Sequence, residues 1–211
     1  MTMTAFIFVL ELIGACAFAI SGAFVGIRKN LDIFGVCIMG LSTAVGGGIL
    51  RDIILGTTPP VMFTNPIYAI VALLTCVIVF SSRVRRFIDK RYVLLMFFDA
   101  IGLGIFTVSG AMRAYEVTAS SNIFLAVFVG VITGAGGGLL RDMMANETPY
   151  IFTKHIYATA SIAGGILFCI LFPLTGRYTA MMAGAFFIVI LRMLAMHYRW
   201  SLPKLEKNTA D

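Results

Sequence analysis

The sequence predicts an all-α membrane protein with seven transmembrane helices, arranged as two inverted three-helix repeats followed by a seventh helix. The first observation is composition. Of the 211 residues, 60% are hydrophobic and 12% are charged, whereas a soluble domain carries roughly a quarter charged residues. The second observation is that the apolar residues form long runs, and about 20 such residues cross the ~30 Å hydrocarbon core of a bilayer. The third is an internal repeat.

Seven apolar runs are the expected spans, and short segments rich in turn-forming or basic residues separate them. Pro59 and Pro60 follow the second run, and a turn from Pro173 to Gly176 follows the sixth. Such residues mark helix boundaries because proline and glycine interrupt the regular backbone. The expected bounds are residues 5–27, 33–57, 66–82, 92–113, 122–145, 155–173 and 178–198.

The basic residues between the spans predict the orientation. With the N-terminus outside, the outer segments hold only Arg113 and Arg177, and the cytoplasmic segments hold eleven Lys and Arg residues. These eleven are Arg28, Lys29, Arg83, Arg85, Arg86, Lys90, Arg91, Lys154, Arg199, Lys204 and Lys207. Because cytoplasmic loops carry such an excess, we expect an outer N-terminus and a cytoplasmic C-terminus. The bases do not form a recognition stripe, so the prediction includes membrane lipids but no nucleic acid as partners.

The internal repeat is visible at three places. Residues 11–23 align with 99–111, the sequence GGGILRD at 46–52 aligns with GGGLLRD at 136–142, and Ile67-Tyr68-Ala69 aligns with Ile156-Tyr157-Ala158. Because three spans per copy is an odd number, the second copy enters the membrane from the opposite side. The expected units are a first repeat at 1–82, a basic cytoplasmic loop at 83–91, a second repeat at 92–175, the seventh helix at 176–199 and a cytoplasmic tail at 200–211.

The glycine triplets lie near the middle of the second and fifth spans. Consecutive glycines weaken a helix by roughly 1 kcal/mol each relative to alanine. One interpretation is a pair of kinked or broken helices that line a pathway with exposed carbonyls. The other is close helix packing, since glycine lets two backbones approach, and both can hold together. The residues concerned are Gly46, Gly47, Gly48, Gly136, Gly137 and Gly138.

Each triplet is followed within one helical turn by an arginine and an aspartate, Arg51-Asp52 and Arg141-Asp142. Charges inside a bilayer need a partner or water, so these side chains are expected to face the bundle interior. Adjacent residues point about 100° apart on a helix, so the arginine and aspartate are not expected to neutralise one another, and each needs a partner on another helix. Depth along the spans gives those partners: Glu11 pairs with Arg51 in the outer half, and Asp99 pairs with Arg141 in the inner half.

Four polar residues carry weaker signals. Ser21 and Ser109 precede glycines, and their hydroxyls serve either a pore or their own backbone. Tyr68 and Tyr157 begin the third and sixth spans, where aromatic residues of the membrane interface are common. The sequence contains no nucleotide-binding loop, catalytic triad or metal-ligand spacing, so we expect no enzyme activity, cofactor or metal.

The doubled GGGxLRD motif, each copy followed by Thr-Pro, resembles the bacterial branch of the trimeric intracellular cation (TRIC) channel family, over about residues 5–200. This bacterial family is also labelled a glycine transporter family. The resemblance implies seven transmembrane helices, a homotrimer in the bacterial inner membrane, and K⁺-permeable conduction through one pore per subunit. It also implies that the second and fifth helices line the pore at their glycine triplets, beside Arg51, Asp52, Arg141 and Asp142. Animal members carry a Lys-Glu-Val motif in this region, which this sequence lacks.

Two functions therefore follow from the sequence. A passive monovalent-cation channel is supported by interior carboxylates, provided that acids neutralise the interior arginines. A secondary transporter for glycine or another small amino acid is the alternative, because inverted repeats are a common transporter plan and free arginines would bind a carboxylate.

Overall fold

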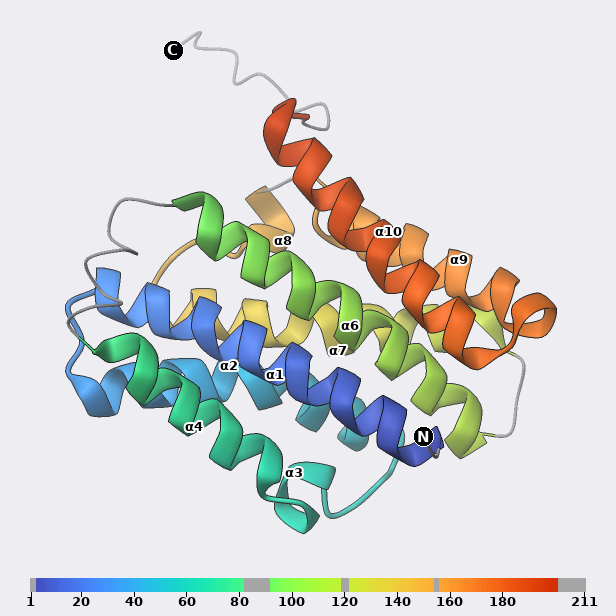
Figure 1. Cartoon of the computed structure of the whole chain (residues 1–211), viewed down its shortest axis with the longest axis horizontal. Helices are drawn as coiled ribbons and strands as arrows, with labels where there is room; N and C mark the ends of the chain where they lie inside the picture. The colour runs from blue at the N-terminus through green and yellow to red at the C-terminus, as the bar shows by residue number, and fades with distance from the viewer. Residues whose placement is uncertain (1–2, 82–91, 119–121, 154–155, 201–211) are drawn as a thin grey trace, which may run out of the picture.

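The computed structural model describes residues 3–81, 92–118, 122–153 and 156–200, and these residues form an all-helical protein (Figure 1). The three longest helices of the first half are α1 (Met3–Arg28), α2 (Ile33–Ile54) and α4 (Ile67–Phe80), and a single turn, α3 (Val61–Thr64), precedes α4. The second half contains α6 (Tyr92–Thr118), α7 (Ile123–Met144), α8 (Tyr150–Thr153), α9 (Ala158–Thr175) and α10 (Arg177–His197).

Six of the described helices, α1, α2, α6, α7, α9 and α10, are long and apolar enough to cross a membrane. The protein is thus a multi-pass membrane protein. The third predicted span is an apolar helix of 14 residues, α4, which measures about 21 Å at 1.5 Å per residue. The predicted end of the sixth span at residue 173 lies two residues before the end of α9 at Thr175. Helix α9 includes Pro173, and Gly176 with its φ of 77° follows the last helical residue and ends the helix.

The two halves show the same pattern of helix contacts. Helices α1, α2 and α4 pack on one another, as do α6, α7 and α9. The halves meet where α1 contacts α6 and α2 contacts α7, and α10 packs outside on α6 and α9. In Figure 1, α4 lies at one edge of the bundle, and α9 and α10 lie at the opposite edge. The centre of the protein is therefore built by the four helices α1, α2, α6 and α7.

The glycine triplets lie where α2 and α7 cross. A Cβ on Gly47 would overlap the carbonyl oxygen of Thr133 on α7, and a Cβ on Gly137 would overlap the carbonyl oxygen of Thr43 on α2. The close-packing interpretation is thus confirmed. The expectation of broken helices is wrong, because α2 and α7 are continuous α-helices through their triplets. Both helices are thus continuous and in close contact at the triplets, and a kink there stays a prediction.

Ion pairs at the helix ends join segments that the predicted orientation places on the same side of the membrane. Lys29 Nζ lies 2.9 Å from Glu147 Oε1, and both belong to expected cytoplasmic segments. Arg177 Nη1 lies 3.5 Å from Glu116 Oε1, and both belong to expected outer segments. The basic loop at 83–91 and nearly all of the predicted tail at 200–211 lie outside the described residues.

Candidate functional site: two charge clusters inside the bundle

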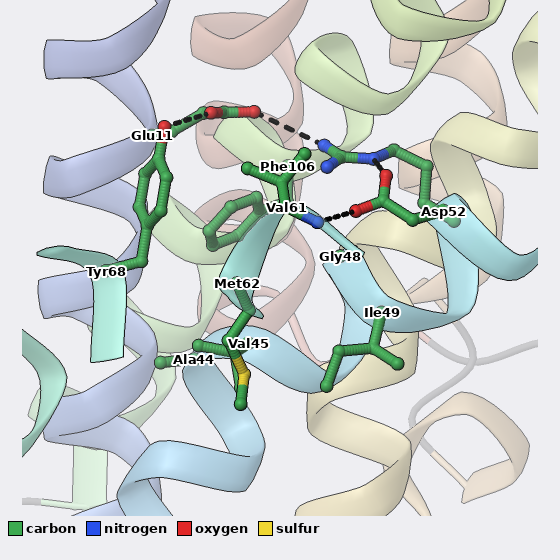
Figure 2. A pocket seen from close by; sticks show the side chains of 11 residues that line it. Glu11, Ala44, Val45, Gly48, Ile49, Asp52, Val61, Met62, Tyr68 and Phe106 are labelled. Atoms are coloured by element: carbon green, nitrogen blue, oxygen red, sulfur yellow. Dashed lines mark hydrogen bonds and ion pairs between the residues drawn. The ribbon is translucent and has the colours of Figure 1, made fainter. Parts of the chain in front are cut away.

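The Glu11 cluster, which consists of Glu11, Arg51, Asp52, Tyr68 and Ser109, joins four helices. Arg51 bridges two acids: its Nη1 donates to Glu11 Oε1 at 3.3 Å and its Nε donates to Asp52 Oδ1 at 2.8 Å (Figure 2). The Tyr68 hydroxyl donates to Glu11 Oε2 at 2.8 Å, and the Ser109 hydroxyl donates to Glu11 Oε1. Glu11 of α1 is therefore held by α2, α4 and α6 together.

Asp52 also positions the chain that follows α2. Its Oδ2 accepts a hydrogen bond of 2.8 Å from the backbone N–H of Val61, the first residue of α3. The first N–H groups of a helix have no acceptor within the helix, and a carboxylate there satisfies one of them. One aspartate thus connects the arginine of the cluster to the turn that leads into α4.

A small pocket of about 40 Å³ lies against the Glu11 cluster. Its polar wall is formed by Glu11, Arg51, Asp52 and Tyr68, and Gly48 lines it where α2 has no side chain (Figure 2). The apolar part of its lining comprises Ala44, Val45, Ile49, Val61, Met62 and Phe106. The pocket combines two carboxylates and one guanidinium in a largely apolar surrounding, where electrostatic interactions are stronger than in water.

The Asp99 cluster, which consists of Asp99, Arg141, Asp142, Ser21, Tyr157 and Arg192, occupies the corresponding place in the second half. Arg141 Nη1 donates to Asp99 Oδ1 and to Ser21 Oγ, both at 2.5 Å, and its Nε donates to Asp142 Oδ1 at 2.8 Å. Asp142 Oδ2 accepts from the backbone N–H of Tyr150 at 2.8 Å, as Asp52 does from Val61. The side chains of Arg141 and Asp99 have no exposed surface.

Arg192 of α10 is the member of this cluster that sequence reasoning missed. Its Nη2 lies 3.8 Å from Asp99 Oδ2, and its Nη1 donates to the carbonyl of Ile156 at 3.2 Å. Its guanidinium carbon lies 4.6 Å from the centre of the Tyr157 ring, within the range of a cation–π interaction. The sequence signal for it was a third arginine within a predicted span, in a helix outside the repeat.

The predicted acid–arginine pairs are confirmed, because Arg51 lies 3.3 Å from Glu11 and Arg141 lies 2.5 Å from Asp99. The prediction that neighbouring residues do not neutralise one another is wrong. Each arginine also bonds the aspartate that follows it, at 2.8 Å. The arginine side chain is long enough to fold back along the helix, so its guanidinium reaches an acid whose Cβ points elsewhere.

The serines connect the two halves of the protein. Ser109 of α6 bonds Glu11 of α1, and Ser21 of α1 bonds Arg141 of α7. Both hydroxyls bond side chains of other helices and not their own backbone, so the backbone interpretation of the serines is wrong. The interfacial interpretation is wrong for Tyr157, which is buried, and stays a prediction for Tyr68. Tyr68 bonds Glu11, and Tyr157 is 2% exposed beneath Arg192.

The two tyrosines provide a matched pair for measurement. We expect Tyr68→Phe to lower the free energy of unfolding by about 1–2 kcal/mol, because the variant loses a hydrogen bond to a carboxylate. Tyr157→Phe should change it by less than about 0.5 kcal/mol, since the Tyr157 hydroxyl has no hydrogen-bond partner among the described residues. Unfolding by a denaturing detergent measures both variants, and equal losses would contradict the assigned bonds.

Comparison with known proteins places the chain in a family. A family model described as "Glycine transporter" matches it twice, over residues 8–83 and 96–173. A UPF0126 membrane protein of Deinococcus radiodurans is 38% identical over 198 residues, covering 92% of this chain and 89% of the relative. The UPF0126 inner membrane protein YadS of Escherichia coli K12 is 36% identical over 207 residues, covering 94% and 97%.

Solved structures of TRIC channels share the fold. One, from a study of conductance through TRIC cation channels, is 40% identical with a TM-score of 0.85, covering 96% of this chain and 98% of that one. The TRIC orthologue from Rhodobacter sphaeroides is 34% identical with a TM-score of 0.83, covering 92% and 98%. A prokaryotic TRIC channel in 0.5 M KCl is 32% identical with a TM-score of 0.86, covering 95% and 100%. The chain thus belongs to the family of that glycine-transporter model and is a bacterial member of the TRIC channel family.

Proposed function

We propose that this protein is a passive channel for monovalent cations, with K⁺ as the permeating ion. The observation that carries the proposal is the pairing of the interior arginines. Arg51 and Arg141 each contact two carboxylates, and Arg192 contacts Asp99. An unpaired arginine would repel cations, whereas here Arg51 lies between two acids, which leaves negative charge in excess, and the arginines of the second cluster are neutralised. The TRIC cation channels of similar sequence and fold support the same function.

We propose that the pathway runs inside each subunit along α2 and α7, past the two charge clusters. The pocket beside Gly48 supports its outer part, because it lies against the carboxylates of Glu11 and Asp52. Gly138 takes the matching position on α7. The proposed pathway residues are Glu11, Ser21, Gly46, Gly47, Gly48, Arg51, Asp52, Asp99, Ser109, Gly136, Gly137, Gly138, Arg141 and Asp142.

The proposed setting is a homotrimer in the bacterial inner membrane, with the N-terminus outside and seven spans built as two inverted repeats plus α10. The excess of basic residues in the expected cytoplasmic segments supports the orientation. A family model that matches each half of the chain separately supports the repeat. The proposed units keep the bounds 1–82, 83–91, 92–175, 176–199 and 200–211, and α4 would be the third span. The names of the solved relatives support the trimer.

Glu11→Gln tests the proposed pathway. With all groups ionised, the Glu11 cluster carries one net negative charge, and the substitution removes it. Clefts of one charge sign concentrate counter-ions strongly, so we expect flux of radiolabelled Rb⁺ into proteoliposomes to fall by about tenfold. The matched control is Glu116→Gln, because Glu116 is partly exposed and pairs with Arg113 and Arg177 at the end of the bundle. Equal flux in the two variants would contradict the pathway.

A carrier for glycine is the second candidate, and two observations favour it. The matching family model is described as a glycine transporter, and the pocket presents both a guanidinium and carboxylates, the groups that complement a zwitterion. In a carrier, Arg51 would bind the substrate carboxylate, so Arg51→Ala would abolish saturable uptake. In a channel, the same variant would still conduct, with altered selectivity.

A further inference from the structure

The two clusters differ in charge although their repeat sequences correspond. The Glu11 cluster has two carboxylates, on Glu11 and Asp52, and one guanidinium. The Asp99 cluster has two carboxylates and two guanidiniums, because α10 adds Arg192. With every group ionised, the first cluster is negative by one charge and the second is neutral. The difference comes from the helix that lies outside the repeat.

The guanidinium of Arg192 lies beside Asp99 without a hydrogen bond to it. Its side chain is 8% exposed, yet the distance of 3.8 Å from Asp99 Oδ2 exceeds that of a hydrogen bond. Among the described residues Asp99 Oδ2 has no hydrogen-bond donor, although the side chain is fully buried. Arg141 already pairs with Oδ1 of the same carboxylate, and Arg192 adds a second cation on the Oδ2 side. This second cation, the guanidinium of Arg192, is part of the protein and is attached to α10.

The two equivalent glycines, Gly48 and Gly138, also differ: the space beside Gly48 is open and the space beside Gly138 is filled. A Cβ on Gly48 would meet only Arg51 Nη2, at 3.9 Å, because this glycine faces the pocket. A Cβ on Gly138 would lie 2.6 Å from the Tyr157 hydroxyl, whose ring lies beneath Arg192. The space that is open beside Gly48 is thus filled, beside Gly138, by Tyr157, and Arg192 lies over the ring of that tyrosine.

We infer that the Arg192 guanidinium occupies, beside the Asp99 cluster, the position that a mobile monovalent cation occupies beside the Glu11 cluster. As a result, ions flow unequally in the two directions. This inference rests on the proposed channel function and assigns Arg192 as a residue that determines rectification. Cations entering from the Glu11 side meet a negative cluster first, whereas cations entering from the other side meet a neutral one. The negative side therefore collects more ions.

Single-channel recordings in symmetric KCl test the inference. For the native protein, the current at one polarity should exceed that at the other by about twofold or more, since a negative cleft raises local cation concentration by a larger factor. Arg192→Gln should raise the conductance and bring the ratio close to one, because both clusters then carry the same charge. Arg192→Lys should keep the native ratio, and Arg177→Gln removes a positive charge from the bundle surface as a control.

Glu11→Gln provides a second variant that does not depend on α10. It makes both clusters neutral, so the ratio should also approach one, but with a lower conductance. A native channel with equal currents at both polarities, or a native ratio in Arg192→Gln, would overturn the inference and leave the channel function intact. A native protein without any K⁺ current would overturn the channel function itself.

Discussion

Gly47→Ala is expected to lower the free energy of unfolding by at least about 3 kcal/mol, at or beyond the upper end of typical overpacking costs. The new Cβ would overlap the carbonyl oxygen of Thr133, a backbone atom that no side-chain rotation can move. Helix α2 would have to shift away from α7, and the central contact between the two halves would be lost. Gly137→Ala should behave in the same way, because its Cβ would overlap the carbonyl oxygen of Thr43.

The neighbouring glycine is the control for this prediction. In Gly48→Ala the nearest atom to the new Cβ is 3.9 Å away, and alanine is favoured over glycine in a helix by up to about 1 kcal/mol. Gly48→Ala should therefore leave stability unchanged or raise it, although both substitutions have the same chemistry and lie in the same triplet. Titration with a denaturing detergent gives both values. Equal behaviour of Gly47→Ala and Gly48→Ala would contradict the crossing of α2 and α7.

Arg141→Met is expected to cost about 3–5 kcal/mol of unfolding free energy, the range found when one member of a buried ion pair is removed. The substitution keeps an elongated side chain but leaves Asp99 and Asp142 without their shared guanidinium. Arg192 lies 3.8 Å from Asp99 and does not contact Asp142 in the described structure, so it compensates only in part. Ser21 would lose its charged donor as well.

Arg177→Met is the matched control for Arg141→Met. Its side chain is 31% exposed and pairs with Glu116 at 3.5 Å, and exposed ion pairs contribute about 0–1 kcal/mol. The amount of folded protein in detergent after heating, followed by gel filtration, separates the two cases. If Arg141→Met were as stable as Arg177→Met, the Asp99 cluster would not hold the bundle together.

The spans and the main ion pairs were predictable from the sequence for a physical reason. Lipid requires long apolar helices, so hydropathy located all six helices of membrane-spanning length in the described residues. Lipid also makes an isolated charge costly, so the depth of Glu11 and Asp99 along their helices identified the arginines that neutralise them. Both inferences need only the position of a residue along its own helix.

The contacts that were not predicted depend on how helices rotate and cross. The bond from Ser21 to Arg141 joins residues 120 positions apart, and no periodicity within α1 indicates it. Arg192 lies in a helix without a counterpart in the repeat, so symmetry provided no partner for it. The triplets admitted both a broken helix and a close crossing. The structure distinguishes them, because α2 and α7 are continuous helices whose backbones lie close together at the triplets.

Passive cation conduction is tested most directly by one paired measurement. The purified protein is placed in planar bilayers under a KCl gradient, and radiolabelled glycine uptake is measured in liposomes from the same preparation. We predict discrete single-channel current steps that reverse near the K⁺ equilibrium potential, without saturable glycine uptake. Saturable glycine accumulation without unitary current steps would contradict the channel and would assign Arg51 to the carboxylate of a transported amino acid.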